Sequence, residues 1–420
     1  MNECGKMILK SNREYSVQGQ SLQALADTFA TPFYLYDLDL IENQYKSLYQ
    51  YIPWPALKIH YAMKANYNKD ILVRLREANA CIDAVSPAEV LLALALGFKP
   101  EKIIFTANHM TDADMHMVKA QKVLLNIDSL FRLERYAACY PGSEVSLRFN
   151  PDVVTGENEK VQTGGKAAKF GLLLEEASQA AAIARQYNLR IVGIHMHAGS
   201  GIGDTEAVYQ GMKNVLQIAT RERFPKLRFV DFGGGFKVKY HPNEPEVNYE
   251  DFGKKIVQLF AAYCREYGRE LALYFEPGKF IAAEAGCLIM QVNTVREANG
   301  RVIIGTDAGF PQCIRPVFYG AYHPVINISN PGGALCEYDV YGNTCESGDC
   351  FAKERLLPTV RVGDYLCLLN AGAYCFSMAS IYNLRSLPAE AVVQQGTVRL
   401  SRAKATPEQL VQQVLAVYRS

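Results

Sequence analysis

Short apolar runs alternate with segments of helical period between residues 58 and 276. The runs are KIHYAM (58–63), CIDAV (81–85), KIIFT (102–106), VLLNI (123–127), EVSLRF (144–149), RIVGIHMH (190–197), RFVDFG (228–233) and LALYFE (271–276). Between them, segments such as 69–80 and 249–268 repeat apolar residues at the spacing of a helix face. Eight strands alternating with helices predict an α/β protein with a closed (β/α)8 TIM-like barrel, and an open doubly wound sheet is the alternative. The run FYLYD (33–37) is a ninth strand candidate whose place the pattern leaves open.

The pattern changes after about residue 286, where helical periodicity fades and β-rich runs follow. These runs are CLIMQVNTVRE (287–297), RVIIGTD (301–307), EYDVYGNT (337–344) and DYLCLLNAG (364–372). Turn residues separate them, which predicts an all-β domain, either an antiparallel barrel or a sandwich. We therefore expect a barrel domain over 33–285 and a second domain over 286–420, to which 1–32 contributes. The segment 406–420 is helix-like, and the polar, glycine-bearing segment 151–171 is expected to be a long loop.

Composition and charge narrow the classes of function. The chain has 420 residues, of which 49% are hydrophobic and 21% charged, as in globular proteins with a large core. Its formal net charge of +1 gives no sign of binding to nucleic acid or to a membrane surface. We see no signal peptide and no apolar run of spanning length, and the eleven cysteines form no CxxC pair. The expectation is a cytoplasmic protein with reduced thiols and no metal site.

Polar residues or glycines stand at the exit of every predicted barrel strand. In a (β/α)8 barrel the carboxyl ends of the strands meet at one mouth, where catalytic groups gather. The exit residues are Lys64, Asp83, Asn108, Asp128, Arg148, Asn150, His197, Ser200, Gly233, Gly234, Gly235 and Glu276. Solvated loops make many strand ends polar, but they do not readily explain a lysine, a histidine, three glycines and a glutamate at one mouth. We therefore expect an active site there.

Two glycine-bearing loops at this mouth indicate a phosphate site. DFGGGF (231–236) exposes backbone N–H groups and allows a phosphate to approach closely. HMHAGSG (195–201) adds the hydroxyl group of Ser200 beside two further glycines. The chain has neither a P-loop nor a dinucleotide fingerprint, so ATP and NAD are poor candidates.

A phosphate site, a strand-end lysine and a strand-end carboxylate together indicate pyridoxal 5'-phosphate (PLP). Lys64 would form the Schiff base, His197 would lie on the face of the ring, and Glu276 would face the ring nitrogen. A carboxylate in that place keeps the pyridine ring protonated, so the ring stabilises a carbanion at the α-carbon of the substrate. This favours decarboxylation over racemisation, which is better served by a weaker electron sink.

The motifs YAMKAN, HAGSG, GGG, EPG, CESGD and GAY, in this order, resemble those of the PLP-dependent decarboxylases with an alanine-racemase-like (fold type III) barrel. The resemblance extends over roughly residues 30–395. The segments 307–323, 345–353 and 372–390 are most similar to those of the diaminopimelate decarboxylases. This implies a carboxy-lyase of lysine biosynthesis that converts meso-2,6-diaminopimelate to L-lysine and CO2. The alternatives are the same chemistry on ornithine, lysine or a specialised biosynthetic intermediate, and a non-catalytic PLP-binding homologue.

The resemblance also implies roles for individual residues. Lys64, Cys345, His197 and Glu276 would be catalytic, with Cys345 protonating the α-carbon after CO2 leaves. The implied cofactor-binding residues are Lys64, Asp83, His197, Ser200, Gly233, Gly234, Gly235, Glu276, Gly278 and Tyr374. The implied substrate-binding residues are Lys279, Arg315, Tyr319, Glu346 and Tyr374. In this family the CESGD segment reaches into the partner subunit's site, which implies a homodimer with shared active sites.

The far end of the substrate gives a physical reason for preferring diaminopimelate. It carries a carboxylate and an ammonium group, which Arg315 and Glu346 would bind, whereas ornithine would not need the arginine. The alternative is that Arg315 forms a structural ion pair at the junction of the domains. Three positions depart from the family: Lys279 replaces the usual arginine, the loop 197–201 resembles that of the ornithine branch, and 342–347 lacks the usual Gly-Pro. They leave room for a related substrate.

Overall fold

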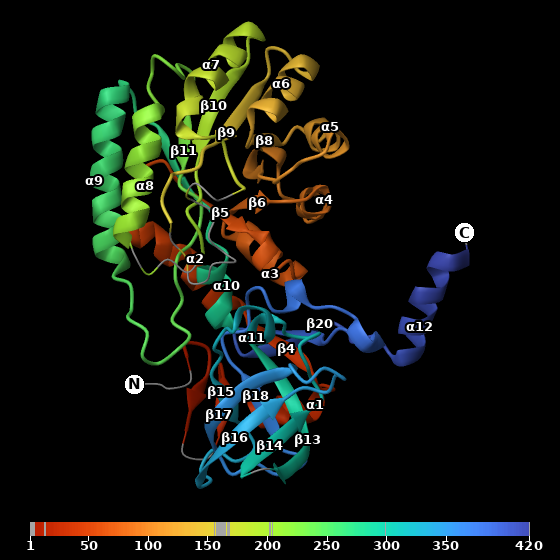
Figure 1. Cartoon of the computed structure of the whole chain (residues 1–420). Coiled ribbons are helices and arrows are strands. Elements are labelled where there is room, and N and C mark those ends of the chain that lie inside the picture. The colour runs from red at the N-terminus through yellow and green to blue at the C-terminus, as the bar shows by residue number, and fades with distance from the viewer. Residues whose placement is uncertain are drawn as a thin grey trace.

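The chain folds into a closed barrel surrounded by helices and a separate mixed β-sheet (Figure 1). The computed structural model describes residues 5–11, 14–154, 156, 165, 169–200, 203, 205–298 and 300–419. The barrel lies in the upper part of Figure 1, and the second sheet lies below it. The loop expected over 151–171 falls largely outside the described residues. Among the helices of the described ranges, none is long and apolar enough to cross a membrane.

Eight parallel strands close the barrel in the order β10-β11-β12-β5-β6-β7-β8-β9. They are β5 (Leu57–Ala62), β6 (Cys81–Ala84), β7 (Ile103–Phe105), β8 (Leu124–Ile127), β9 (Glu144–Arg148), β10 (Arg190–His195), β11 (Phe229–Asp231) and β12 (Ala272–Phe275). Each strand coincides with one of the eight predicted apolar runs. The predicted closed (β/α)8 barrel is therefore confirmed, and the open sheet is not found.

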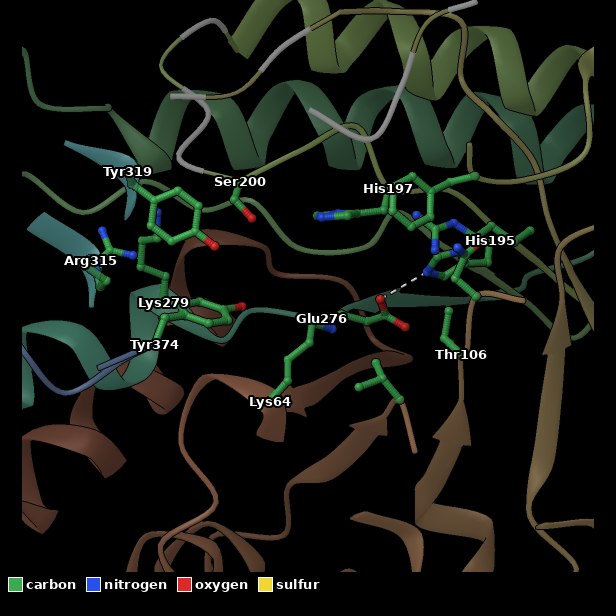
Figure 2. Close-up of a pocket in the computed structure, with 14 residues that line it drawn as sticks. Lys64, Thr106, His195, His197, Ser200, Glu276, Lys279, Arg315, Tyr319 and Tyr374 are labelled. Carbon is green, nitrogen blue, oxygen red and sulfur yellow. Dashed lines mark hydrogen bonds and ion pairs between the residues drawn. The ribbon is translucent and has the colours of Figure 1, made fainter. Parts of the chain in front are cut away.

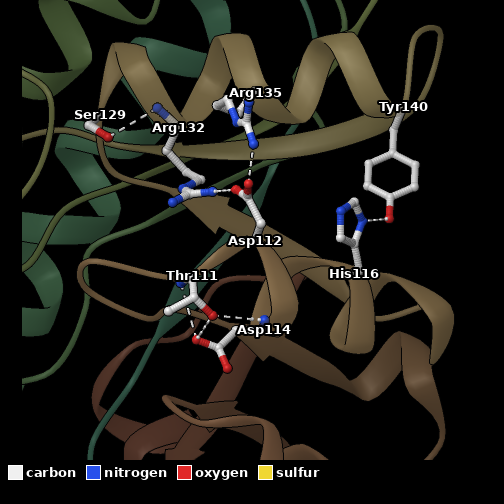
Figure 3. Close-up of polar contacts among 8 residues, drawn as sticks. All are labelled: Thr111, Asp112, Asp114, His116, Ser129, Arg132, Arg135 and Tyr140. Atoms are coloured by element: carbon white, nitrogen blue, oxygen red, sulfur yellow. Dashed lines mark hydrogen bonds and ion pairs between the residues drawn. The ribbon is translucent and has the colours of Figure 1, made fainter.

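A helix follows every barrel strand and covers its outer face. The helices are α3 (Lys69–Glu77), α4 (Pro87–Ala95), α5 (Asp112–Ala120), α6 (Leu130–Cys139), α7 (Ala177–Gln186), α8 (Thr205–Ile218), α9 (Tyr249–Tyr267) and the short α10 (Lys279–Ala282), with α2 (Leu38–Tyr51) preceding β5. Ser, Thr or Asn side chains cap several of them by accepting a hydrogen bond from a free backbone N–H. On the surface, Asp112 of α5 forms ion pairs with Arg132 and Arg135 of α6 (Figure 3). The capping residues in the sequence thus mark where several of these helices begin.

The interior of the barrel is apolar at one end and polar at the other. Ile104, Val192, Phe229 and Tyr274 form a small cluster of their own, apart from the main core that joins strands and helices. Side chains two residues apart in a strand share a face, so Asp231 and Glu276 follow Phe229 and Tyr274 on the interior side. This alternation brings polar groups to the carboxyl ends of the strands.

The second sheet has the order β17-β16-β14-β13-β4-β19-β20, with β18 also paired to β13 and β15 paired to β18. Its strands are β4 (Phe33–Asp37), β13 (Gly286–Ala298), β14 (Arg301–Thr306), β15 (Val325–Asn327), β16 (Leu335–Tyr341), β17 (Cys350–Pro358), β18 (Tyr365–Leu368), β19 (Ala389–Gln394) and β20 (Thr397–Arg402). The expected all-β character is found, but the sheet is mixed and not purely antiparallel. The pairs β4–β19 and β14–β16 are parallel, because long connections return the chain to the sheet in the same direction.

Strand β4 is the ninth candidate, FYLYD, and it belongs to the second sheet. It pairs with β13 and β19, which lie some 250 residues or more later in the sequence. We expected the barrel domain to start at residue 33, but residues 33–37 form a strand of the second sheet. The other domain boundaries remain predictions. The N-terminal segment forms strands β1 (Leu9–Lys10), β2 (Tyr15–Val17) and β3 (Gln20–Ser21) and helix α1 (Leu22–Thr28). Of these elements, β2 and α1 share a hydrophobic cluster with the second sheet. Helix α12 (Pro407–Ala416) lies in the segment predicted to be helical, and Figure 1 shows it projecting outward.

Candidate active site

A cavity of about 350 Å³ lies at the carboxyl ends of the barrel strands (Figure 2). It is lined by Lys64, Val85, Thr106, Asn108, Arg148, Phe170, His195, His197, Ser200, Glu276, Lys279, Arg315, Tyr319 and Tyr374. A smaller adjoining space is bordered by Gly234, Gly235 and Gly278 together with Lys64, Ser200 and Tyr374. Most of the residues predicted to form the site are therefore brought together. Arg315 and Tyr319 come from helix α11 (Arg315–Tyr319), and Tyr374 comes from the segment between β18 and β19.

Lys64 lies in a 3-10 turn immediately after β5 and forms an ion pair with Asp83 of β6. The distance between Lys64 Nζ and Asp83 Oδ2 is 2.5 Å. Asp83 is completely buried, whereas 37% of the Lys64 side chain is exposed because it faces the cavity. Burial lowers the pKa of Lys64, but the charges of Asp83, Tyr374 and Glu276 outweigh it and hold this pKa above its usual value. The amine is thus an ammonium group that has to lose a proton before it can act as a nucleophile.

Glu276 follows β12 and accepts a hydrogen bond from His195 of β10. His195 Nε2 lies 3.0 Å from Glu276 Oε2 (Figure 2), and both side chains are almost fully buried. Burial, reinforced by Arg148, lowers the pKa of His195 well below its usual value, so its ring is neutral and the Nε2–H group donates. Burial raises the pKa of Glu276 above its usual value, although the charges of Lys64 and Arg148 oppose this shift.

The second histidine of this segment, His197, is held by the glycine loop. Its Nδ1 atom accepts a hydrogen bond from the backbone N–H of Gly234 over 3.2 Å. Burial, followed by the charges of Arg148 and Lys64, lowers the pKa of His197 well below its usual value. The imidazole is therefore neutral and fixed in orientation at the wall of the cavity.

The residues of the cavity fit PLP in their packing as well as in their chemistry. A Cβ atom on Gly234 would lie 2.4 Å from the backbone oxygen of Glu276, and one on Gly278 would lie 2.9 Å from Ala65 Cβ. The loops are therefore close-packed around the small space, where backbone N–H groups and the Ser200 hydroxyl could hold a phosphate. Glu276 Oε1 is buried without a hydrogen-bond partner among the described residues, as suits a carboxylate that meets a protonated ring nitrogen.

The opposite side of the cavity carries two cationic side chains. Arg315 is 4% exposed, and its Nε–H group donates to His323 Nε2 over 3.3 Å. Its guanidinium carbon lies 5.1 Å from the centre of the Tyr240 ring, and Lys279 Nζ lies 5.9 Å from the same centre. Tyr319 flanks Arg315 at 5.8 Å. The two cations therefore converge on one region, which could bind a carboxylate.

Cys345 and Glu346 do not line this cavity in the single chain. Both are exposed, and they are held by the segment around Tyr382. Tyr382 donates its hydroxyl hydrogen to Glu346 Oε1 over 2.5 Å, and its oxygen lies 3.8 Å from Cys345 Sγ. Asn383 Nδ2 lies 3.5 Å from the same sulfur. Cys345 and Glu346 therefore form an exposed group outside the cavity of their own chain.

Three polar residues of the barrel were not assigned to the site from the sequence: His195, Asp231 and Arg148. His195 precedes His197 by two residues, so the period of a strand predicts that both point into the barrel. Asp231 opens the DFGGGF motif, and Arg148 was recognised at a strand exit without a role. The sequence therefore contained the signal for His195, whereas contacts of Asp231 and Arg148 depend on the closure of the barrel.

Comparison with known proteins defines the class of protein. The family model described as "Pyridoxal-dependent decarboxylase, pyridoxal binding domain" matches residues 38–283, which include all eight barrel strands. The barrel is thus the pyridoxal-binding domain of a PLP-dependent decarboxylase, and PLP is its cofactor.

Relatives over the full length narrow the family. The diaminopimelate decarboxylase of Methanothermobacter thermautotrophicus is 38% identical over 93% of this chain and 93% of its own. The crystal structure of diaminopimelate decarboxylase from Helicobacter pylori complexed with L-lysine is 31% identical, with a TM-score of 0.87, and covers 94% of this chain and 99% of its own. Lysine/ornithine decarboxylase from Vibrio vulnificus complexed with putrescine is 25% identical, with a TM-score of 0.76, covering 89% and 97%. The chain belongs to the pyridoxal-dependent decarboxylases, in the family of the diaminopimelate decarboxylases.

Proposed function

We propose that this chain is a carboxy-lyase that converts meso-2,6-diaminopimelate to L-lysine and CO2, as a cytoplasmic homodimer. The observation that supports this choice of substrate is the excess of positive charge in the cavity. Lys64, Arg148, Lys279 and Arg315 line it, against one carboxylate, Glu276, among the described lining residues. A phosphate-bearing cofactor and a substrate with two carboxylates supply the negative charge that such a cavity requires.

At the end of the substrate that loses its α-carboxylate, residues of this chain would hold the cofactor and set the protonation of the lysine amine and the ring nitrogen. When bound, PLP accepts the electron pair left behind as the α-carboxylate departs. Lys64 would supply the amine that attaches to the cofactor's aldehyde group, and Asp83 holds the lysine side chain in place through their ion pair. Glu276 would keep the ring nitrogen protonated, and the neutral imidazole of His197 would lie against the ring. The phosphate would be held by Gly233, Gly234, Gly235, Gly278, Ser200 and Tyr374.

At the distal end, Arg315 binds the second carboxylate of the substrate, with Lys279 and Tyr319 beside it. Arg315 is buried and kept in place by His323, so its guanidinium group needs little reorganisation on binding. Lys279 presents a point charge where an arginine would present a planar fork. Glu346 would pair with the distal ammonium group of the substrate.

The exposed position of Cys345 and Glu346 supports the proposed homodimer. Both are exposed on their own chain and lie outside its cavity. We infer that they enter the cavity of the partner subunit, where the Cys345 thiol protonates the α-carbon. Exclusion of water by the partner would then complete the site.

The test is CO2 release from purified, PLP-loaded protein with meso-diaminopimelate, ornithine, lysine and arginine at equal concentrations. Release from diaminopimelate, absent in Lys64→Ala, is the expected result. Release from ornithine or lysine instead would keep the chemistry but change the substrate, and the departures at Lys279 and in the loop 197–201 would then be the first places to look for the cause. No release from any of them would contradict the proposal and favour a binding role.

Replacement of Arg315 tests the distal end separately. Loss of a buried, charge-assisted contact in Arg315→Met should raise KM for diaminopimelate about 10- to 100-fold. Val317→Met is a control on the same helix, because Val317 is 40% exposed and does not line the cavity. Equal KM values in both variants would show that Arg315 is structural.

A further inference from the structure

Three buried side chains meet at the centre of the barrel on adjacent strands. His195 of β10 and Asp231 of β11 are register partners, and Glu276 follows the neighbouring strand β12. One nitrogen or oxygen atom from each residue lies within 4.8 Å of those of the other two. All three residues are at most 6% exposed, so their charges are not screened by water.

His195 can act on Glu276 only as a neutral donor. Its Nε2 atom is 3.0 Å from Glu276 Oε2, and its pKa is lowered well below the usual value by burial and then by Arg148. A neutral imidazole carries one N–H group, and the contact with Glu276 requires it on Nε2. The Glu276 carboxylate is therefore stabilised by a hydrogen bond from His195 but not by a positive charge on it.

Asp231 belongs to the same buried group and is the second candidate donor to Glu276. Its Oδ1 atom accepts a hydrogen bond from the backbone N–H of Gly233 over 2.8 Å, whereas Oδ2 is buried without a hydrogen-bond partner among the described residues, as is Glu276 Oε1. Burial, and then the charge of Glu276, raises the pKa of Asp231 well above its usual value. A carboxyl group that stays protonated at neutral pH has one O–H to donate.

We propose that His195 and Asp231 are positioning residues that hold Glu276 ionised by donating one hydrogen bond each. The ionised Glu276 can then accept a further hydrogen bond, from the protonated ring nitrogen of PLP. The inference rests on the proposed function of Glu276 and deepens it. Two neutral donors stabilise a buried carboxylate, whereas a second ionised carboxylate within 4.8 Å would favour its protonation. A protonated Glu276 could not keep the ring nitrogen charged.

The same three side chains also have the composition of a metal site, since histidine and carboxylates bind divalent cations. The surrounding charges argue for the hydrogen-bonded arrangement. Lys64 and Arg148 both act on Glu276, and two fixed cations beside the group repel a metal ion. Asp231, moreover, already accepts a hydrogen bond from Gly233.

The experiment is 15N NMR of the full-length protein loaded with PLP that is 15N-labelled in the ring. The chemical shift reports directly whether the ring nitrogen carries a proton. The variants His195→Gln and Asp231→Asn keep a neutral donor, whereas His195→Phe and Asp231→Leu remove it. We expect a protonated nitrogen in the wild type and in both conservative variants, and loss of the proton in both apolar variants. In the apolar variants kcat should fall about tenfold or more, with KM within about threefold.

Glu276→Gln separates this inference from the proposed function. If the nitrogen stays protonated in Glu276→Gln, the role of Glu276 itself is wrong. If Glu276→Gln loses the proton while His195→Phe and Asp231→Leu keep it, only the positioning role is overturned. Should the apolar variants fail to fold, Asp231→Asn still tests the inference. Loss of the proton from the ring nitrogen in this variant would mean that Asp231 acts as an anion and not as a neutral donor. A stoichiometric divalent metal in the wild type, absent from His195→Phe, would also overturn the inference.

Discussion

Replacing Gly234 with alanine tests whether the glycine loop after β11 is a close-packed cradle for the cofactor. The added Cβ atom would lie 2.4 Å from the backbone oxygen and 3.2 Å from the carbonyl carbon of Glu276. Because the obstacle is backbone and not a flexible side chain, the loop or the end of β12 has to move. Overpacking of this kind costs about 1–3 kcal/mol. If that cost falls on the bound state, the Kd for PLP rises about 5- to 150-fold.

The assay is titration of apo-protein with PLP, followed by the absorbance of the bound cofactor. Gly332→Ala is the matched control, because nothing lies within 4 Å of a Cβ added there and the residue is exposed. We expect the control to bind PLP like the wild type and to keep its melting temperature. Wild-type affinity in Gly234→Ala would refute the reasoning, since the loop would then have room to spare.

The remaining predictions concern stability, pH dependence and the dimer. Thr111 caps α5 by accepting from the N–H of Asp114 (Figure 3), so Thr111→Ala should lose about 1 kcal/mol of unfolding free energy and Thr111→Ser little, in urea titrations at unchanged kcat. Burial, and then the charge of Lys58, lowers the pKa of His60 to about 3 in the folded protein, against about 6.5 in the unfolded chain. Below about pH 6.5 only the unfolded chain takes up a proton at this histidine, so the folded protein loses stability as the pH falls. Between pH 7.5 and 5.5, His60→Gln should therefore lose about 1.4 kcal/mol less than the wild type, and equal losses would contradict this. Mixed dimers of inactive Cys345→Ser and Lys64→Ala should recover up to about a quarter of wild-type activity, and no recovery would argue against shared sites.

The barrel could be predicted from the sequence because its strands and helices are local patterns. Each strand is a short apolar run followed by a helix, and several of these helices start at a capping residue. The second sheet was harder, because its pairings are set by contacts far apart in sequence. The run FYLYD has the composition of a strand, yet only the assembled sheet shows that its neighbours are β13 and β19. The strands β15, β17, β19 and β20 were also missed, although β19 and β20 form a local hairpin.

The site could be predicted where chemistry coincides with the end of a strand. Lys64, His197 and Glu276 all line the cavity, since barrel closure brings every strand end to one mouth. Contacts between side chains could not be predicted, because they depend on the register of neighbouring strands. The contact of His195 with Glu276 is one of these, and it links strands whose contacting residues are 81 positions apart.

The position of Lys64 also depends on the second domain, so the barrel alone is an incomplete site. The backbone N–H of Tyr374 donates to the Ala65 carbonyl over 2.8 Å, and Ser377 Oγ donates to the same oxygen over 3.1 Å. Asn66 Nδ2 reaches back to the Gly372 carbonyl over 2.9 Å. Tyr374 has a φ of 58°, a conformation that costs free energy for a residue with a side chain and persists only where its surroundings hold it. These bonds fix the turn that carries the reactive lysine and direct the tyrosine ring into the cavity, so the chemistry of the barrel requires the chain that follows it.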